Sequence, residues 1–417
     1  MGGNFTQALA YVHSLERFGI QPGLERITKI CAALGNPQRA LRVVHVAGTN
    51  GKGSTCAMIA SIAQTAGLRT GLFTSPYVID FRERCQLNGK MIPKTDFAAL
   101  TWEVKSACSA HGIAVTEFEF ITALAFLYFA RQNCDLVVLE VGLGGRFDAT
   151  NVIETPELCV ITKISLDHTQ ILGGTIDAIA REKSGIIKQG VPVVTSAEQP
   201  DSALEIIKSR ADMCAAPLKT AKQPKILQST LLGGDADFDG LRVHVPFLGD
   251  HMICNAAMAV LAGQMLGFSP QAIQSGIAAA KMPARQEVLR QNPLILLDGG
   301  HNEDGARALR NTFAAHIKTP CLMLCGMMAD KNADAYLANL PSAVSRLIAC
   351  TPNVPRAMPA ADLAQRANRV FAHTHAIDSP ADALAFALNL QQKSNEPLLI
   401  CGSFYLAGEL RKLLNGS

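Results

Sequence analysis

A glycine-rich segment, His45-Val-Ala-Gly-Thr-Asn-Gly-Lys-Gly-Ser-Thr55, offers the clearest local chemistry in this 417-residue chain. It follows a predicted strand and opens a predicted helix, so its backbone N–H groups and the helix N-terminus would attract phosphate oxygens. Lys52 would reach the terminal phosphates of a nucleotide, and Ser54 would cap the helix or touch phosphate. The match to a general P-loop is imperfect, because Val46 takes the first glycine position and Gly53 separates Lys52 from Ser54. We therefore predict phosphate binding over the alternative, a plain glycine-rich turn.

Two further polar residues stand at the ends of predicted strands. Glu140 lies in the apolar run Asp135–Val141, where a buried carboxylate needs a metal, several donors or a cation such as Arg146. His168 follows the next strand, although a single histidine is usually a satisfied core or loop residue. Because ligands collect at the carboxyl ends of parallel strands, we expect both residues beside the P-loop. Mg²⁺, which prefers oxygen ligands, would suit that edge.

The second half of the chain repeats this strand–turn–helix arrangement. In Leu297-Asp-Gly-Gly-His-Asn302, Asp298 could hold a ribose hydroxyl or a substrate amine, and His301 could orient a carboxylate. The alternative there is capping of the next helix by Asn302. In Cys401-Gly-Ser-Phe-Tyr405, Ser403 could receive a ligand or only cap a helix.

Short apolar strands alternate with helical patterns, which predicts βαβ units and a mostly parallel sheet. We expect an α/β protein with a P-loop-type N-terminal domain, residues 1–287, and a smaller Rossmann-like α/β C-terminal domain, residues 288–417. Residues 217–240 are predicted to be a loop or hairpin insertion. The predicted strands are Val43–Ala47, Leu136–Val141, Leu158–Ile164, Val191–Thr195, Leu294–Leu297, Cys321–Cys325, Leu347–Cys350, Val370–Ala372 and Leu398–Cys401.

The composition limits the class of partner. Hydrophobic residues make up 48% and charged residues 18%, and the net charge is only +3. So small a surplus predicts no general electrostatic binding of nucleic acid or of an anionic membrane. We find no secretory pattern and no apolar run of bilayer length, so a cytoplasmic location is expected. The 12 cysteines sit in apolar runs without a C-x-x-C motif, which indicates buried free thiols.

Taken together and in this order, the segments resemble the Mur-ligase superfamily, and more closely the folylpolyglutamate synthase/dihydrofolate synthase family. The resemblance runs from about Gly23 to Ser403 and rests also on Arg-Glu-Lys-Ser-Gly-Ile at 181–186. It implies a ligase that uses ATP to phosphorylate a carboxylate and then joins it to the amine of L-glutamate. The implied substrates are ATP, L-glutamate, dihydropteroate and reduced folates. Mg²⁺ at two sites, a monomer, and no nucleic-acid or membrane partner are also implied.

The resemblance assigns roles residue by residue. Catalytic roles fall to Lys52, Lys183 and His301, with Lys183 expected to be a carbamate near the second metal. The metal ligands would be Ser75, Glu140 and His168, and the incoming glutamate would be placed by His301 and Ser403. The ATP-binding residues would be Asn50, Gly51, Lys52, Gly53, Ser54, Asn255, Arg285 and Asp298.

The pterin side of the resemblance decides which reaction is expected. Asp148 is the predicted polar anchor of the pterin ring, and Phe118 is predicted to pack on it. The whole predicted pterin set is Leu24, Glu25, Arg26, Thr116, Glu117, Phe118, Glu119, Phe147, Asp148 and Ala149. Members limited to polyglutamation tend to vary here, so we favour the bifunctional enzyme. Tyr77 and Asp80 depart from the family pattern in a mobile loop.

Three alternatives stay open at this point. The first is an enzyme that only extends folates with glutamate. The second is a nucleotide-dependent switch, which the P-loop alone would allow but which would not need the Asp298–His301 cluster. The third is a cell-wall ligase of the same superfamily, which we would expect to carry a further UDP-binding domain before the P-loop.

Overall fold

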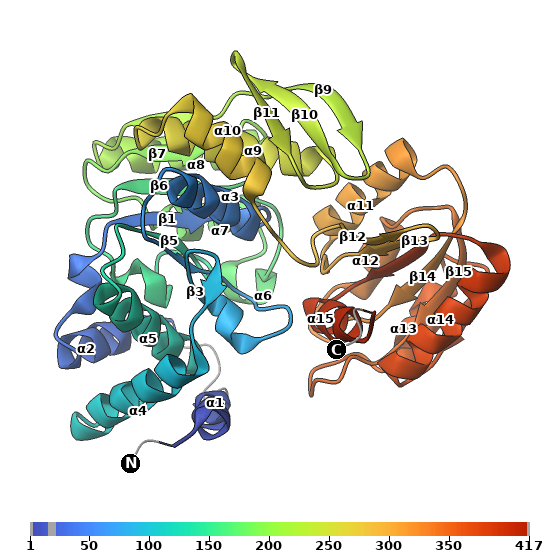
Figure 1. Cartoon of the computed structure of the whole chain (residues 1–417), viewed down its shortest axis with the longest axis horizontal. Coiled ribbons are helices and arrows are strands. Elements are labelled where there is room, and N and C mark those ends of the chain that lie inside the picture. Colours follow the sequence, from blue (N-terminus) through green and yellow to red (C-terminus); the bar gives the residue numbers. More distant parts are fainter. Residues whose placement is uncertain (1–2, 16–21, 415–417) are drawn as a thin grey trace.

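The computed structural model describes residues 3–15 and 22–414. Two α/β lobes lie side by side, and a small antiparallel sheet packs over the seam between them (Figure 1). The first lobe contains an eight-stranded sheet in the order β4-β3-β2-β5-β1-β6-β7-β8. Its strands are β1 (Val43–Ala47), β2 (Thr70–Phe73), β3 (Cys85–Leu87), β4 (Lys90–Met91), β5 (Leu136–Glu140), β6 (Leu158–Ile161), β7 (Val193–Thr195) and β8 (Leu218–Thr220).

The centre of this sheet is parallel, because β1 pairs in parallel with both β5 and β6. Among the described strands of this sheet, only β3 runs against the others, pairing antiparallel with both β2 and β4 at one edge. The strand β2 was not predicted, since its sequence Thr-Gly-Leu-Phe contains a polar residue and a glycine and gives no continuous apolar run. The helices of this lobe are α1 (Phe5–Ser14), α2 (Glu25–Ala33), α3 (Lys52–Thr65), α4 (Lys94–Ala110), α5 (Glu117–Arg131), α6 (Thr169–Leu172), α7 (Ile176–Ser184), α8 (Asp201–Met213), α9 (Asp250–Met265) and α10 (Pro270–Ala279).

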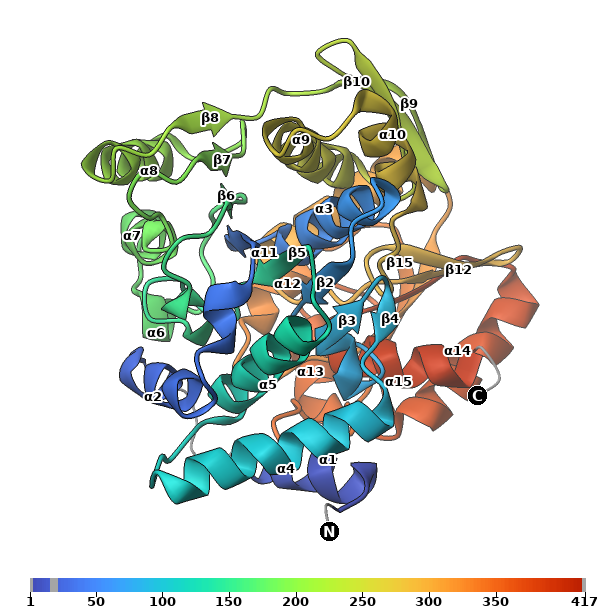
Figure 2. The ribbon, with the colours of Figure 1, turned by 60° about the vertical axis from the view of Figure 1, so that its left-hand side comes forward.

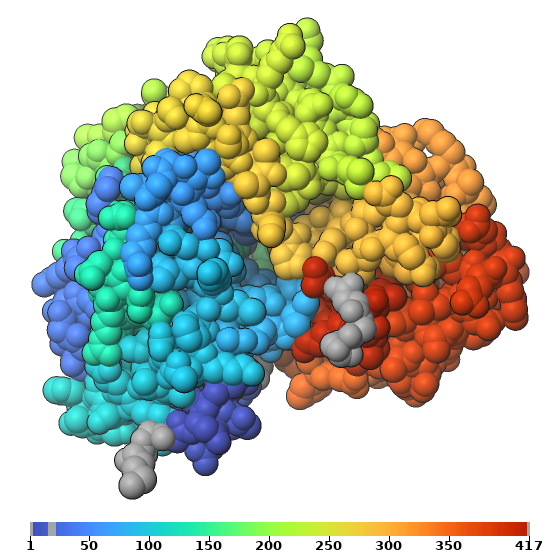
Figure 3. Space-filling view, viewed as in Figure 1, coloured from blue at the N-terminus to red at the C-terminus, as the bar shows by residue number. Residues whose placement is uncertain are grey.

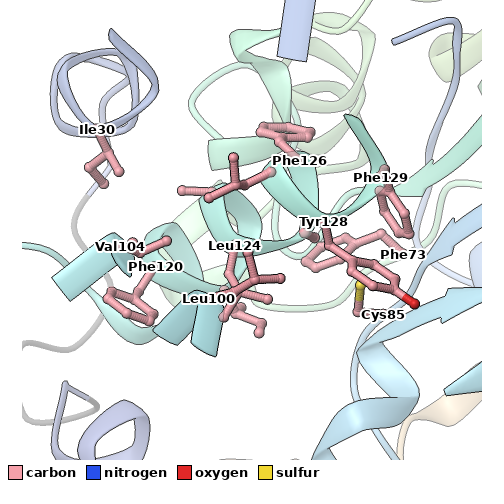
Figure 4. Close-up of a cluster of buried hydrophobic side chains, with 14 of the residues drawn as sticks. Ile30, Phe73, Cys85, Leu100, Val104, Phe120, Leu124, Phe126, Tyr128 and Phe129 are labelled. Carbon is pink, nitrogen blue, oxygen red and sulfur yellow. The ribbon is translucent and has the colours of Figure 1, made fainter. Parts of the chain in front are cut away.

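Helices cover both faces of the large sheet. On one face α3, α9 and α10 pack together, and on the other α1, α2 and α4 surround α5 (Figure 2). A capping box between Thr116 and Glu119 begins α5. The helix is apolar around its whole circumference, and the surrounding elements bury it on all sides. Figure 4 shows Phe126, Tyr128 and Phe129 of this helix with Phe73 of β2. This cluster packs α5 against β2 and so holds one of the strands from which the site loops begin.

The second lobe contains a six-stranded sheet in the order β12-β13-β17-β14-β15-β16, which is parallel except for β12. Its strands are β12 (Glu287–Gln291), β13 (Leu294–Leu297), β14 (Cys321–Cys325), β15 (Val344–Ala349), β16 (Thr374–Ala376) and β17 (Leu398–Cys401). Its helices are α11 (Glu303–His316), α12 (Ala333–Ala338), α13 (Ala360–Ala367), α14 (Pro380–Ser394) and α15 (Phe404–Leu414). The predicted fold class, two α/β domains with mostly parallel sheets, is confirmed. The division proposed after residue 287 falls at the first residue of β12.

One predicted strand is displaced. Val370–Ala372 was expected to be a strand, but the strand β16 begins at Thr374. The amides of Val370 and Phe371 both donate to the carbonyl of Ala367, so the turn that ends α13 continues through these residues. Val370 is also exposed. The end of α13 therefore determines the conformation of these residues, despite their β-rich sequence.

The insertion at residues 217–240 contains β8 and most of a three-stranded antiparallel sheet, β11-β10-β9. These strands are β9 (Lys225–Thr230), β10 (Gly233–Phe238) and β11 (Leu241–Val245). The turn between β9 and β10 reaches the second lobe, where Leu231 packs against its core and the Ser229 hydroxyl lies 3.1 Å from Nε2 of His316. In the space-filling view, the two lobes meet along a narrow seam (Figure 3).

All twelve cysteines are free, and eleven of them are buried as predicted. Burial raises the pKa of the Cys31 thiol to about 12 and that of Cys108 to about 11. Within the described part of the chain, no helix combines the length and the apolar character needed to cross a membrane.

Candidate active site

A cavity of about 860 Å³ opens between the two lobes and is lined by both of them. The first lobe contributes the loops that follow β1, β2, β5 and β6, which all leave the same edge of the sheet, as predicted. The second lobe contributes residues 301–302, 328, 330–331, 356 and 403–405, while Arg285 comes from the linker before β12. Most of the predicted site residues therefore line one cavity, although they lie far apart in the sequence.

The glycine-rich loop takes the shape that its sequence predicts. Gly51 caps α3 with a left-handed φ of 85°, and a Cβ there would lie 2.4 Å from Oδ1 of Asn255. Gly48, at φ 147°, leaves even less room, since its Cβ would lie 1.8 Å from Oγ1 of Thr162. Only glycine fits at either position, and the loop backbone consequently lies open at the N-terminus of α3.

Polar side chains brace this loop. Lys52 donates from Nζ to the carbonyl of Thr49 at 3.1 Å, and the Ser54 hydroxyl donates to the carbonyl of Gly51 at 2.9 Å. Asn255 of α9 donates to Ser54 Oγ at 3.0 Å. Asn50, Gly51, Lys52 and Gly53 line the cavity, whereas Ser54 and Asn255 stand behind them.

The buried carboxylate of Glu140 lies at the end of β5 and faces this loop. It accepts a hydrogen bond from the backbone N–H of Ser75 at 3.0 Å. Burial raises its pKa, while Lys52, the Ser75 N–H and Arg285 act in the opposite direction. Arg146, the alternative partner, instead lies 5.0 Å from the Phe147 ring. Among the described residues, Glu140 has a cationic environment but no direct ion pair.

His168 lines the cavity after β6 and adopts a left-handed backbone with φ 50°. Within residues 3–15 and 22–414, no three His, Cys, Asp or Glu side chains form a cluster that could hold a metal alone. The predicted set joins one carboxylate, one imidazole and the Ser75 hydroxyl. Such a set fits Mg²⁺, because phosphate and water oxygens normally complete its octahedral shell.

Lys183 stands behind the cavity on α7, with only 5% of its surface exposed. Its Nζ donates to the carbonyl of Gly48 at 2.7 Å. Burial, together with the nearby positive charge of Lys52, lowers the pKa of Lys183 to about 7. At neutral pH, therefore, a large share of this amine carries no charge. The charged residues around Lys183 in the sequence indicate only a solvent-exposed helix face, so its burial could not be predicted from them.

The second lobe presents its predicted residues around Phe404. The Arg285 guanidinium lies 4.3 Å from the centre of that ring, and burial lowers its pKa while Asp298 opposes the change. Asp298 is buried and accepts from the N–H of Gly300 at 3.1 Å. Burial raises the pKa of Asp298, and Arg285 acts against that rise. Asp298 does not line the cavity, but its carboxylate favours the charged form of the Arg285 guanidinium.

His301 and Ser403 both line the cavity. His301 has Nδ1 3.1 Å from the carbonyl of Gly299, and burial with the charge of Lys331 lowers its pKa to about 4. Ser403 Oγ accepts from the N–H of Tyr405 at 3.1 Å, so the capping alternative holds while the hydroxyl hydrogen stays available.

Direct hydrogen bonds cross the seam between the lobes. Asn302 caps α11 by accepting from the Gly305 N–H, as the capping alternative predicted, and its amide also donates to Asn50 Oδ1 at 3.1 Å. The same amide donates to Asp167 at 3.2 Å. Lys331 forms an ion pair with Asp167, with 3.2 Å between Nζ and Oδ1. The P-loop is thus held by the second lobe as well as by its own strand.

The predicted pterin residues separate into two groups. Seven of them, Thr116, Glu117, Phe118, Glu119, Phe147, Asp148 and Ala149, line one part of the cavity. Leu24, Glu25 and Arg26 do not line it, although the adjoining Pro22 and Gly23 do, so the role of these three residues in pterin binding stays a prediction. Arg26 instead donates to the Glu119 carboxylate at 2.9 Å, and Leu24 packs against the hydrophobic core.

Sequence patterns missed six charged residues of the cavity: Arg84, Asp167, Glu182, Asp330, Lys331 and Arg356. Asp167 precedes His168 directly, and Lys331 follows the strand β14, so both stand at positions where the other candidates were found. Arg84 lies within the short helical turn Phe81–Arg84, and its guanidinium lies 5.5 Å from the Tyr77 ring and 5.2 Å from the Phe81 ring. No spacing rule links it to the site.

Models of two families match this chain. The Mur ligase middle domain matches residues 46–263, and the glutamate ligase domain of Mur ligases matches residues 284–404. The chain belongs to the Mur ligase family. The first match spans the P-loop, Glu140, His168 and Lys183, and the second spans Arg285, His301 and Ser403. The two family domains therefore meet at the cavity.

Individual relatives of this Mur ligase cover nearly its whole length. A dihydrofolate synthase/folylpolyglutamate synthase from Bacillus subtilis (strain 168) is 37% identical, with 98% of this chain and 99% of the relative aligned. A folylpolyglutamate synthase from Lacticaseibacillus casei is also 37% identical, with 99% of each aligned. The folylpolyglutamate synthase of Mycobacterium tuberculosis, solved with ADP and AMPPCP, superposes with a TM-score of 0.91 over 99% of each chain at 29% identity. The resemblance stated from the motifs is confirmed.

Proposed function

We propose that this Mur ligase forms an acyl phosphate on dihydropteroate, or on the γ-carboxylate of a folate, and joins it to L-glutamate. A carboxylate oxygen attacks the γ-phosphorus of ATP, and ADP leaves. The glutamate amine then attacks the acyl carbon, phosphate leaves, and the nitrogen loses a proton. The products are dihydrofolate and folylpolyglutamates. The observation that carries the proposal is the single cavity into which both family domains direct their charged residues.

The first lobe would hold the nucleotide. Backbone N–H groups at the start of α3 and the Lys52 ammonium neutralise charge on the β- and γ-phosphates as the phosphoryl group moves. Mg²⁺, when bound by Ser75, Glu140 and His168, would add positive charge at the phosphate oxygens. Asn255, through Ser54, keeps the loop in shape while the phosphates bind.

A carbamate on Lys183 would support a second Mg²⁺. Carbamate formation joins a neutral amine to CO₂ and releases a proton, and the lowered pKa of Lys183 supplies that neutral amine. The nitrogen keeps one hydrogen afterwards, so its bond to the Gly48 carbonyl can persist. The new carboxylate would then stand beside the P-loop, where metal and phosphate charges would offset it.

The second lobe would receive glutamate. A pKa of about 4 leaves His301 neutral near pH 7, and its Nδ1 faces the Gly299 carbonyl, so Nδ1 carries the hydrogen. Its Nε2 lone pair can then accept a hydrogen bond from the glutamate nitrogen. The Ser403 hydroxyl can donate to a glutamate carboxylate. Contacts such as that between Lys331 and Asp167 close the lobes over the acyl phosphate and limit its hydrolysis.

The pterin part of the cavity supports the bifunctional activity. Phe118 and the exposed Phe147 offer ring surfaces, and Asp148 offers a buried carboxylate that can accept from N–H groups of the pterin. The two relatives described above are equally similar to this chain, yet only one is named for both activities. The alternative of polyglutamation alone therefore has to be tested directly.

The test supplies ATP, Mg²⁺ and L-glutamate with either dihydropteroate or a reduced folate, and follows ADP release and the glutamylated product. We expect product with both acceptors. Product with reduced folates alone would establish the polyglutamation-only alternative. Slow ADP release that needs no acceptor would instead point to a nucleotide-dependent switch. Lys52→Ala should abolish ADP release in each case, and the exposed Lys208→Ala should not.

A monomer in the cytoplasm completes the proposal. One chain supplies both halves of the cavity, so no partner subunit is needed to build the site. Twelve free thiols suit a reducing compartment.

A further inference from the structure

The central strand β1 contains one polar residue, His45, whose side chain is fully buried. Its strand neighbours Val44 and Val46 pack in the core beneath α3 and α9, so His45 faces the opposite side of the sheet. There its Nε2 lies 2.9 Å from Oγ1 of Thr150, which is also fully buried. None of the roles assigned above uses either residue.

The hydrogen bonds continue from Thr150 to Asp148. Oγ1 of Thr150 lies 2.6 Å from Oδ1 of Asp148, and an ionised carboxylate can only accept. The threonine hydrogen therefore points to Asp148, and the remaining hydrogen must come from Nε2 of His45. Burial, aided by the charge of Lys188, lowers the pKa of His45 to about 3, which keeps the ring neutral. The tautomer with hydrogen on Nε2 is thus fixed by its neighbours.

This assignment leaves Nδ1 of His45 buried with no hydrogen-bond partner. An unpartnered ring nitrogen in the core reduces stability, and an apolar side chain would suit the strand better if packing alone mattered. The position therefore carries a cost that some other role must offset. The hydrogen bond toward Thr150 is the only polar contact of this ring in the described structure.

Four donors surround the carboxylate of Asp148. Oδ1 accepts from both the N–H and the hydroxyl of Thr150, and Oδ2 accepts from the N–H of Leu143 at 2.9 Å. The backbone N–H of Gly142 is a further donor to this carboxylate. Asp148 also lines the cavity, so these donors fix the orientation in which its carboxylate meets a ligand there.

We infer that His45 is a positioning residue for pterin binding, acting through the Thr150 hydroxyl to orient the Asp148 carboxylate. The inference rests on the proposed function, in which Asp148 anchors the pterin ring. By donating to Thr150, His45 restricts rotation of the hydroxyl and keeps its hydrogen on Asp148. The carboxylate then meets the pterin ring in one orientation, which is set before any ligand arrives.

The experiment compares two substitutions at one position in the full chain. His45→Leu removes the donor, while His45→Gln places an amide N–H at nearly the same reach as Nε2. For His45→Leu we expect the KM for dihydropteroate to rise about tenfold, the size of one lost hydrogen bond in a charged network. The kcat and the KM values for ATP and glutamate should stay within about twofold of the wild type, and His45→Gln should restore the dihydropteroate KM.

The other outcomes overturn the inference. Equal losses in all kinetic constants, or the same behaviour of Leu and Gln variants, would mean that His45 only fills space. If His45→Leu does not fold, Thr150→Val and Thr150→Ser provide the same comparison, and only Val should raise the dihydropteroate KM.

Two controls separate this inference from the function on which it rests. Asp148→Asn should itself raise the dihydropteroate KM, and a normal value there would refute the anchor and the inference together. If the wild-type protein makes no dihydrofolate, the proposed bifunctional activity fails. If Asp148→Asn weakens binding but His45→Leu does not, only the role of His45 fails.

Discussion

Replacing Lys183 with methionine should stabilise the folded protein while it abolishes ligation. The ammonium form of this buried lysine is disfavoured, so its pKa falls from 10.5 to about 7 on folding. That difference corresponds to roughly 4 kcal/mol of stability lost at pH 7. Methionine fills similar space without a charge, but it gives up the hydrogen bond to the Gly48 carbonyl, worth about 1 kcal/mol. The net expectation is a gain of about 3 kcal/mol at pH 7.

The pH dependence gives the sharper test. The unfolded lysine holds its proton up to pH 10.5, whereas the folded one releases it near pH 7, so the wild type gains stability as the pH rises between these values. The penalty is complete below about pH 6, nearly complete at pH 7, and about 1.4 kcal/mol at pH 9.5, where the lost hydrogen bond offsets most of it. The advantage of Lys183→Met should therefore shrink from about 3 kcal/mol to near zero over this range.

Urea unfolding in CO₂-free buffer measures both values, because removal of CO₂ keeps the wild-type lysine as a free amine. Lys208→Met, at an exposed position of α8, is the matched control and should change stability by less than about 0.5 kcal/mol. A Lys183→Met protein that is less stable at pH 7, or equally shifted at both pH values, would refute the burial argument. Full ligase activity in this variant would refute the carbamate role.

Two further substitutions test the P-loop and the seam. Gly51→Ala should weaken binding of a non-hydrolysable ATP analogue at least about tenfold by calorimetry, because its Cβ would meet Asn255 and its φ is left-handed; unchanged affinity would contradict the loop geometry. Lys331→Met breaks an ion pair whose side chains are only 12% and 15% exposed, and it should favour the open arrangement of the lobes about tenfold. Small-angle scattering should then show a larger radius of gyration, and an identical radius would refute the role of this pair in closure.

The sequence predicted the site best where local geometry dictates residue type. The Gly48–Gly51 turn needs glycine for its backbone angles and its close contacts, so its pattern is visible without a structure. Strand ends are similarly visible, because the apolar run that ends at Glu140 stops where the chain leaves the sheet. The alternation of strands and helices then placed the glycine-rich turn and Glu140 at the same edge of the sheet.

Other residues could not be predicted, because their roles arise from tertiary contacts alone. The pairing of Asp167 with Lys331 joins positions 164 residues apart on two lobes, and no local spacing encodes it. The low pKa of Lys183 follows from its burial. The sequence does not show that burial, because the neighbouring residues Arg181 and Glu182 are charged and suggest an exposed helix face. Leu24 and Arg26 show what a motif leaves open, since it does not tell that Arg26 holds Glu119 and that Leu24 packs against the core.

The burial of the cysteines has a practical consequence for studying closure. Thiolate is the reactive form. Eleven of the thiols are buried, and burial raises the pKa of the half-buried Cys134 to about 11, so maleimide reagents should react slowly with the native protein. A cysteine introduced on the surface of each lobe would then be labelled selectively, without first removing twelve native residues. Fluorescent probes at two such sites would report the distance across the seam during turnover, in an otherwise unaltered enzyme.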